Sequence, residues 1–407
     1  MSELSYLEKF LDGVEVEWLP LGEVSALRRG RVMSKGYLTE NFGPYPVYSS
    51  QTANNGKIGS INTFDFDGEY ISWTTDGANA GTVFYRTGKF SITNVCGLIT
   101  LKSKYSLIYK FLFYWLTIEA KKHVYSGMGN PKLMSHQVEN IPVPIPCPDN
   151  PEKSLAIQSE IVRILDTFSA LTAELTAELN MRKKQYNYYR DQLLSFDDEQ
   201  EKPIYLEKLL DGVEVEWLPL GEVSALRRGR VMSKGYLTEN FGPYPVYSSQ
   251  TANNGKIGSI NTFDFDGEYI SWTTDGANAG TVFYRTGKFS ITNVCGLITL
   301  KSKYSLIYKF LFYWLTIEAK KHVYSGMGNP KLMSHQVENI PVPVPCPDNP
   351  EKSLAIQSEI VRILDKFDTL TNSITEGLPR EIELRQKQYE YYRDLLFSFP
   401  KPETVSN

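Results

Sequence analysis

Cysteine is scarce in this sequence of 407 residues. There are four, Cys96, Cys147, Cys295 and Cys346, and no two of them form a CxxC pair. Four isolated cysteines do not make a disulfide framework, so we expect buried, reduced thiols in a cytoplasmic protein.

Long apolar segments are lacking as well. Residues 1–13 have neither the basic n-region nor the apolar h-region of a secretion signal. The most apolar run, residues 105–116, contains Lys110 and is shorter than the roughly 20 residues that span a bilayer. We expect a buried helix there and no membrane partner.

Sequence motifs of catalytic, metal-binding and cofactor-binding sites are also missing. The four histidines are His123, His136 and their equivalents in a second copy of the sequence, and each is expected to be structural. The Gly-Lys pairs at 56–57 and 88–89 lack the other residues of a P-loop. Neither G-x-G-x-x-G nor the Asn/Asp-Pro-Pro-Tyr/Phe of an amino-methyltransferase occurs. We expect no catalytic residue, no metal ligand and no cofactor in this chain.

What the sequence does contain is a long internal repeat. Residues 11–144 are identical to residues 210–343, and identity resumes at 146–166 and 345–365 after one Ile-to-Val change. This period is far longer than the 20–50 residues of solenoid repeats, so each copy should be a complete domain with a tail. The predicted domains are a globular domain at 1–148, a helix segment at 149–199, a second globular domain at 200–347, a second helix segment at 348–400 and a C-terminal tail at 401–407.

The globular part of each copy has the composition of a β-rich domain. Residues 15–145 are rich in Tyr, Thr, Val, Gly and Asn, and a helix is expected at 105–123. The proline-rich segment 142–151 cannot be helical. Turns are expected at Asn-Asn-Gly, Asp-Gly and Thr-Gly-Lys sequences. Alternating stretches predict strands at 57–66, 82–87 and 90–101.

The tails predict long helices. Residues 154–196 contain no proline or glycine, and their apolar residues recur at steps of three and four, as in a coiled-coil seam. The sequence Thr-Ala-Glu-Leu occurs twice in a row at 172–179. Each copy adds about one helical turn, or about 6 Å, so we expect the repeat to set the length of the helix. In the second helix, residues 353–399, Gly377-Leu378-Pro379 should cause an interruption. The predicted seam residues are Ile161, Ile164, Phe168, Leu171, Leu175, Leu179, Tyr186, Tyr189, Leu193 and Phe196.

Two long apolar seams in one chain most simply bury each other, although an ordinary amphipathic helix on a domain surface remains the alternative. The expected fold class is therefore α+β. We expect two β-rich globular domains separated by two long antiparallel helices, paired as a coiled coil, with pseudo-twofold symmetry.

Local charge points to nucleic acid although the net charge of the chain is −4. Residues 15–145 carry 13 Lys and Arg against 10 Asp and Glu, a local charge of +3. Basic side chains suit phosphates and guanine edges, and Asn or Gln side chains suit adenine edges. Each polar segment can also be read as a solvated loop or a plain turn. The candidate DNA-binding residues are Arg28, Arg29, Arg31, Lys35, Gln51, Asn54, Asn55, Lys57, Thr74, Thr75, Asn79, Tyr85, Arg86, Lys89, Asn130 and Lys132, with Arg227, Arg228, Arg230, Lys234, Gln250, Asn253, Asn254, Lys256, Thr273, Thr274, Asn278, Tyr284, Arg285, Lys288, Asn329 and Lys331 in the second copy.

Three stretches carry a resemblance to a known family. They read YLEKFLDGVEVEWLPLGEV, IPVPIPCPDNPEKSLAIQSEIVRILDTF and LTAELTAELNMRKKQYNYYRDQLLSF. Over nearly its whole length the chain resembles the specificity subunit of type I restriction–modification systems, particularly the type IC group.

The resemblance implies two target-recognition domains, each binding half of a bipartite site in double-stranded DNA, with the TAEL repeat as a determinant of the spacer. It also implies that the helices dock two modification subunits, which carry S-adenosylmethionine and methylate adenine. Two restriction subunits, ATP-dependent motor-nucleases, join them, so ATP and Mg are expected in partner subunits. Family members usually carry two different recognition domains; two identical ones imply an interrupted palindrome.

For subunit docking we expect an exposed cluster of tyrosine and basic side chains, because such residues suit an interface. The alternative is that the tyrosines pack in the helix seam. The cluster comprises Arg182, Lys183, Tyr186, Tyr189 and Arg190, with Arg385, Lys387, Tyr389, Tyr392 and Arg393.

Two other functions stay open. A self-sufficient DNA adenine methyltransferase would methylate DNA without a partner. A duplicated scaffold that binds proteins or glycans would be indifferent to duplex DNA.

Overall fold

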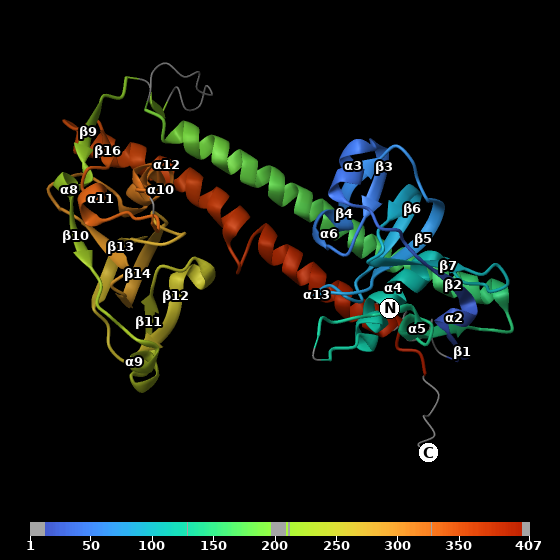
Figure 1. Cartoon of the computed structure of the whole chain (residues 1–407). Coiled ribbons are helices and arrows are strands. Elements are labelled where there is room, and N and C mark those ends of the chain that lie inside the picture. The colour runs from blue at the N-terminus through green and yellow to red at the C-terminus, as the bar shows by residue number, and fades with distance from the viewer. Residues whose placement is uncertain (1–12, 128, 197–208, 211, 327, 401–407) are drawn as a thin grey trace. The chain divides into compact units, whose positions relative to one another are not determined.

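The chain forms two compact units. The structure, a computed structural model, describes residues 13–127, 129–196, 209–210, 212–326 and 328–400 (Figure 1). Unit 1 comprises residues 1–175 and 382–407, and unit 2 comprises residues 176–381. Each unit therefore combines one β-rich domain with parts of the long helices. The domain boundaries expected from the sequence stay a prediction, and the expected tail at 401–407 lies outside the described residues.

The β-domain of unit 1 spans residues 16–146 and is built on a six-stranded sheet of order β2-β7-β5-β6-β3-β4. A two-stranded sheet pairs β1 with β8. In the larger sheet β3 pairs in parallel with β6, and the other pairs are antiparallel. The elements are β1 (Val16–Pro20), α2 (Leu21–Val24), β2 (Ser25–Arg29), α3 (Lys35–Glu40), β3 (Phe42–Tyr48), η1 (Ala53–Gly56), β4 (Lys57–Ile61), β5 (Phe66–Thr74), β6 (Val83–Ile92), β7 (Cys96–Leu101), α4 (Tyr109–Glu119), η2 (Ala120–His123), α5 (Ser135–Val138) and β8 (Pro142–Pro146).

The β-domain of unit 2 repeats this order, with a six-stranded sheet β10-β15-β13-β14-β11-β12 and a pair of β16 with β9. Identical sequence gives identical local structure in the two copies. The elements are β9 (Val215–Pro219), α8 (Leu220–Val223), β10 (Ser224–Arg228), α9 (Lys234–Glu239), β11 (Phe241–Tyr247), η3 (Ala252–Gly255), β12 (Lys256–Ile260), β13 (Phe265–Thr273), β14 (Val282–Ile291), β15 (Cys295–Leu300), α10 (Tyr308–Glu318), η4 (Ala319–His322), α11 (Ser334–Val337) and β16 (Pro341–Pro345).

The strand and turn predictions need four corrections. The stretch 57–66 is not one strand, because β4 ends at Ile61 and β5 begins at Phe66. The stretch 90–101 is also divided, because β6 ends at Ile92 and β7 begins at Cys96. The Asp-Gly sequence at 67–68 and the Thr-Gly-Lys sequence at 87–89 are not turns, because β5 and β6 run through them. Gly88 faces Gly68 across the β5–β6 ladder, and both have positive φ. Two facing glycines can adopt this conformation without leaving the sheet, so the turn signal was misleading.

The helix expected at 105–123 begins later, at Tyr109, and continues into η2. The residues before it are held extended by the buried Gln158, which comes from the long helix that follows the β-domain. Its side chain accepts a hydrogen bond from the Ile108 N–H at 2.8 Å and donates one to Ser106 O at 2.7 Å. A tertiary contact thus sets the start of α4.

The first long helix, α6 (Pro151–Leu193), follows β8 at once. Asn150 accepts a hydrogen bond from the Lys153 N–H at 3.0 Å, and Pro151 is the first helical residue. Both residue types favour a helix start at these positions. The proline-rich segment is therefore a strand and a helix cap, and α6 has the length that the tail pattern indicated. Among the described residues, no helix combines the length and hydrophobicity of a membrane span.

The second long helix is interrupted, as predicted. It consists of α12 (Pro350–Asn372) and α13 (Leu378–Leu396). Gly377 has φ +81°, and a Cβ atom there would lie 2.3 Å from Thr369 O. Pro379 falls in the first turn of α13, where its missing N–H costs nothing.

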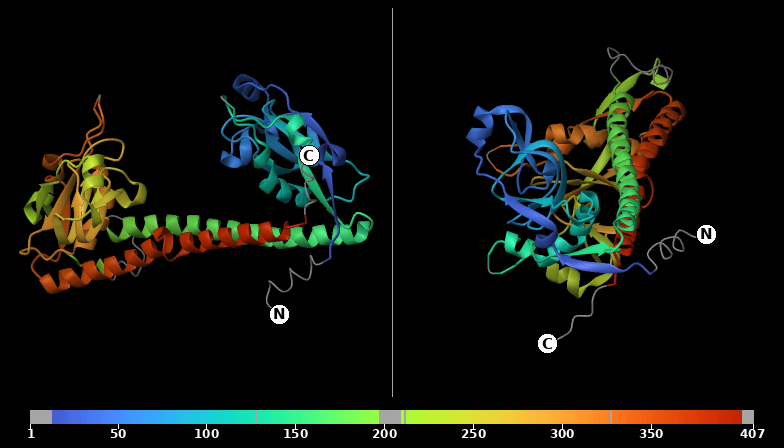
Figure 2. Two further views of the ribbon diagram at one scale, coloured as in Figure 1. Left: turned by 90° about the horizontal axis from the view of Figure 1, so that it is seen from below. Right: turned by 90° about the vertical axis from the view of Figure 1, so that its right-hand side faces the viewer.

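The two long helices lie side by side within each unit (Figure 2), and stacked aromatic rings join them. In unit 1, Phe168 of α6 stacks on Tyr392 of α13, with ring centroids 5.3 Å apart. In unit 2, Tyr189 of α6 stacks on Phe367 of α12, at 5.5 Å. As the residue number rises along α6 the partner's number falls, which is the register of an antiparallel pair.

All ten predicted seam residues are half-buried or buried. Leu171, Leu175 and Leu179, which belong to the TAEL words, are half-buried. Leu165 was not among the predicted seam residues and is fully buried.

Candidate nucleic-acid interface

The loop between β3 and β4 presents a row of polar side chains. Residues 51–55 and Lys57 are exposed, whereas Gly56 is buried. Asn54 and Asn55 both have left-handed backbone conformations, with φ 50° and 53°. Asn tolerates this conformation better than other non-glycine residues. The Gln51 side chain closes the loop by donating a hydrogen bond to Lys57 O at 2.6 Å.

The basic segment, residues 28–35, is connected to this loop through residues 93–94. The Asn94 N–H donates to Arg31 O at 3.0 Å. The Thr93 hydroxyl lies 2.9 Å from the Ser49 hydroxyl, at the foot of the loop. Segments about 20 residues apart in the sequence therefore lie next to each other.

The β5–β6 hairpin contacts both the β3–β4 loop and the segment that carries Asn130 and Lys132. Asn79, at the hairpin tip, donates its side-chain amide to Ser50 O at 3.2 Å. The Gly77 N–H donates to Pro131 O at 3.0 Å, which connects the tip to the segment that carries Asn130 and Lys132. The structure thus brings together the basic segment, the loop at 51–57, the hairpin at 74–89 and the segment at 130–132. In unit 2 the contacts of the hairpin and the loop recur, and a bridge between Arg230 and Thr292 joins the basic segment to them.

The four basic side chains of the first segment differ in availability. Arg28 and Lys35 are exposed and make no side-chain hydrogen bond or ion pair with the described residues. Arg31 is paired with Asp65 at 3.0 Å. Its Nη1 donates to the Tyr37 hydroxyl at 3.1 Å, and this bond, supported by Asp65, raises the pKa of Arg31. Arg29 donates to Asn94 O at 3.1 Å.

Three hairpin candidates do not project from the surface, which corrects the sequence-based expectation. Thr74, Thr75 and Arg86 are buried. The Thr74 hydroxyl donates to Asn79 O, and the Thr75 hydroxyl donates to Asp76 at 2.9 Å. A direct contact of these side chains with a ligand would require the domain to open. Their equivalents in unit 2, Thr273, Thr274 and Arg285, are buried in the same way.

Two further hairpin candidates are engaged with carboxylates. The Tyr85 hydroxyl donates to Glu69, and burial together with this bond raises the pKa of Tyr85. Lys89 is exposed, lies 4.0 Å from Asp67 and packs over the ring of Phe64.

The tyrosines proposed for docking pack in the helix seam instead of standing free. Tyr186 and Tyr189 contact Phe367 in unit 2, and burial raises the pKa of Tyr186 to about 12. In unit 1, Tyr389 and Tyr392 pack against the core. The seam alternative therefore describes these four side chains.

The exposed tyrosines of the helices are ones that the sequence reading missed. Tyr188 is 53% exposed and Tyr391 is 55% exposed. Each precedes a half-buried tyrosine in a Tyr-Tyr-Arg-Asp sequence, so neighbouring residues face different sides of the helix. Lys183 and Lys387 are exposed candidates, whereas Arg190 and Arg393 pair with the aspartate that follows each.

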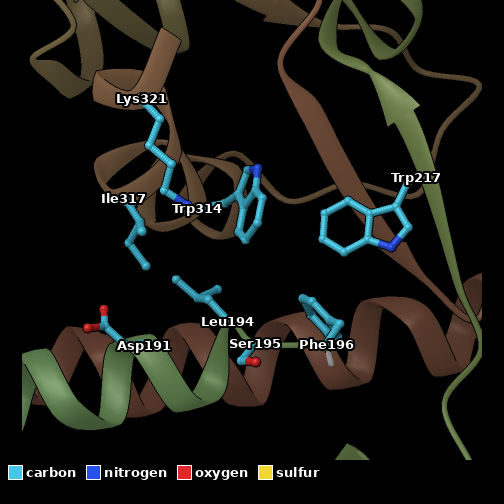
Figure 3. A pocket seen from close by; sticks show the side chains of 8 residues that line it. All are labelled: Asp191, Leu194, Ser195, Phe196, Trp217, Trp314, Ile317 and Lys321. Carbon is cyan, nitrogen blue, oxygen red and sulfur yellow. The ribbon is translucent and has the colours of Figure 1, made fainter. Parts of the chain in front are cut away.

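A cavity of about 560 Å³ opens in unit 2 where the end of α6 meets α10, η4 and β9 (Figure 3). Trp217 and Trp314 lie on one side of it, with ring centroids 5.4 Å apart, and Leu194 and Phe196 lie on the other. In unit 1 the residue equivalent to Leu194 is Phe397. The larger ring packs against Phe111 and Trp115, so identical domains are flanked by different side chains.

Comparison with known proteins agrees with these features. A family model described as the type I restriction modification DNA specificity domain matches residues 13–182 and 212–384. The specificity subunit of the Escherichia coli type I restriction enzyme EcoR124I/EcoR124II is 38% identical over 450 aligned positions, covering 100% of both chains. A putative type I specificity subunit of Mycoplasma pneumoniae is 40% identical, covering 69% of this chain and 96% of that protein.

Solved structures support the fold. The S subunit of a type I restriction–modification system from M. genitalium has a TM-score of 0.60 at 17% identity, covering 96% of this chain and 98% of that one. A chain from a structure of complex assembly in the type I R-M system has a TM-score of 0.54 at 14% identity, covering 95% and 98%.

Proposed function

Because the chain belongs to the family of type I restriction–modification DNA specificity proteins, we propose that it selects the DNA sequence for such a complex and reads an interrupted palindrome. Each β-domain would read one half-site in double-stranded DNA. The observation that carries this proposal is the gathering of four polar segments at one place in each of two identical domains.

The palindromic target follows from the identical sequences of the two β-domains and from the antiparallel direction of the helices. Domains with the same residues have the same base preference. Helices that pair antiparallel favour readers of opposite orientation, and inverted half-sites in duplex DNA have that orientation. The length of the helix pair would then fix the number of unread base pairs between the half-sites.

In this proposal the chain contributes recognition, and its partners contribute the chemistry. Two modification subunits would supply S-adenosylmethionine and methylate adenine, and two restriction subunits would supply ATP- and Mg-dependent translocation and cleavage. We expect the complex to act in the cytoplasm, where it has access to chromosomal DNA.

Sequencing of methylated bases in cells that express this chain with its modification subunit tests the proposal. The expected result is one interrupted motif whose two halves are inverted copies of each other. A motif with two different halves would refute the equal-reader argument. Methyl transfer by the purified chain alone would refute the division of labour.

A further inference from the structure

Arg86 carries a buried positive charge that is not neutralised by any carboxylate in the part of the chain that the structure describes. The residue is 2% exposed, and the described residues place no acidic side chain in an ion pair with it. Its guanidinium lies over the ring of Tyr48, 3.7 Å from the centroid, and over that of Phe84 at 4.5 Å. Arg285 in unit 2 has the same surroundings, with Tyr247 at 3.6 Å. Burying an uncompensated cation is unfavourable, so its retention calls for a specific role.

The hydrogen bonds of this guanidinium lead to the polar loop between β3 and β4. Nε donates to the Ser72 hydroxyl at 3.0 Å, within the hairpin. Nη1 donates to Asn55 O at 2.8 Å, across a sequence separation of 31 residues. Burial lowers the pKa of Arg86 to about 10, so the side chain is still charged at neutral pH. The bond to Asn55 O is therefore charge-assisted, the stronger class of hydrogen bond.

The third nitrogen is packed against the turn itself. Nη2 is buried and has no hydrogen-bond partner among the described residues. It stands where Gly56 leaves room, because a Cβ atom on Gly56 would lie 3.1 Å from it. The guanidinium thus occupies the space below the loop and supports it.

The supported peptide is the strained part of the loop. Two consecutive non-glycine residues, Asn54 and Asn55, are in the left-handed region, and both side chains are exposed. Such a conformation persists only where the surroundings enforce it. A carboxamide can pair bidentately with the N6 and N7 edge of adenine, provided that its backbone is fixed.

We propose that Arg86 and Arg285 are positioning residues for base recognition. Each holds an Asn-Asn turn, Asn54–Asn55 in unit 1 and Asn253–Asn254 in unit 2, so that the amides meet adenine edges, and neither arginine touches DNA. This inference rests on the proposed function and assigns the part of the β-domain that determines specificity.

The test uses the complex of the full chain with its modification subunits, carrying Arg86→Lys, Arg285→Lys or both. Lysine keeps the charge but cannot make the two directed bonds. We expect affinity for the cognate duplex to fall about tenfold for each substitution, because without the charge-assisted bond to the carbonyl of the second turn asparagine the turn no longer holds its amides in place. Affinity for unrelated duplex and the slope of log K against log salt should stay unchanged, because every phosphate contact remains.

The matched control is Lys57→Ala. Lys57 is exposed on the same loop, and its loss should weaken binding to both duplexes and reduce the salt slope. A lower salt slope in Arg86→Lys would mean that Arg86 contacts phosphate, which would overturn the proposal. Unchanged discrimination between the two duplexes would overturn it as well.

A second variant reaches the loop without changing the arginine. Gly56→Ala places a methyl group against Nη2 at a residue with φ +81°, so it displaces the turn from below. The same loss of discrimination is expected. If Arg86→Lys failed to fold, an undisturbed preference in folded Gly56→Ala would still refute the inference.

Hydrogen exchange separates a failure of this inference from a failure of the proposed function. The Ser49 N–H bonds to Gly56 O at 2.9 Å and reports on the loop alone. It should exchange faster in Arg86→Lys while β5 and β7 amides keep their protection. Equal exchange at Ser49 refutes the positioning role whatever the DNA result. A native complex without sequence preference refutes the proposed function instead.

Discussion

Among the basic side chains of the β-domain, Arg28 is available for a phosphate. It is exposed and makes no side-chain hydrogen bond or ion pair with the described residues, whereas Asp65 and Tyr37 hold Arg31 in place. Replacing Arg28 and Arg227 together with Ala should weaken binding to any duplex and lower the salt slope by about 0.9 for each phosphate that is no longer neutralised. Titration at several salt concentrations measures both effects. An unchanged slope would show that neither arginine binds a phosphate.

Thiol reactivity should follow burial. Burial raises the pKa of Cys96 to about 12 and that of Cys295 to about 11, and the reactive thiolate is therefore almost absent at pH 8. Iodoacetamide should label the more exposed Cys346 first and reach Cys96 and Cys295 only after unfolding. Peptide mass mapping with time gives the order. Equal labelling rates in the native chain would contradict the packing of this core.

The polar segments of the candidate site could be predicted from the sequence, but the exposure of their side chains could be predicted only in part. The polar loop at 51–57 was found because its residues are locally polar and contain the Asn-Asn-Gly turn signal. The sequence predicts a DNA contact for Arg86, because the alternation of side chains in a hairpin gives two faces and does not indicate which face is covered. Tyr48, from another strand, covers it, and local sequence holds no record of that pairing.

At the scale of elements, the break between α12 and α13 depends on one glycine. Gly377→Ala combines a positive φ with a clash against Thr369 O, so it should lower the free energy of unfolding by more than the roughly 1 kcal/mol of a φ effect alone. Gly77→Ala is the matched control, since Gly77 has φ +86° and open space around it. Chemical denaturation of the two variants compares them. Equal losses would show that the clash is relieved cheaply.

Leu194 in unit 2 and its equivalent Phe397 in unit 1 can be exchanged to test the packing beside each β-domain. Leu194→Phe should fill part of the unit 2 cavity and raise stability by about 1 kcal/mol, through burial of extra apolar surface. Phe397→Leu should lower the stability of unit 1, because a leucine cannot replace the packing of the ring on Phe111 and Trp115. Thermal unfolding of both variants measures the effects. A loss of stability in Leu194→Phe would mean that the cavity cannot take a ring.

Elements were predictable wherever a local steric rule decided them. Gly377 and Pro379 predict an interruption, because glycine readily adopts positive φ and proline lacks an N–H. The absence of glycine and proline at 154–193 predicts a continuous α6. The start of α4 was not predictable, because the amide of Gln158, 50 residues away, holds Ile108 extended. The strand through Gly88 was missed for a similar reason, since its partner Gly68 lies across the ladder.

For the whole molecule, the length of α6 is the quantity to change. Inserting a third Thr-Ala-Glu-Leu after Leu179 should add about 6 Å and about 40° beyond a full turn. Under the proposed function, the gap between methylated half-sites should grow by one or two base pairs, at about 3.4 Å each. Four residues inserted after Ser103, in the exposed segment between β7 and α4 and away from the candidate DNA-binding residues, should leave the gap unchanged. Methylome sequencing reads both outcomes, and an unchanged gap with the longer helix would refute this role of the repeat.

Each unit has its own hydrophobic core and its own Asn-Asn turn, although the sequences of the two β-domains coincide. A change written into one copy alone would therefore leave the other half-site preference as it was. The two β-domains can therefore be changed one at a time. Substitutions in one domain should convert a symmetric target into a hybrid one, in which each half of the new motif depends on the residues of one copy.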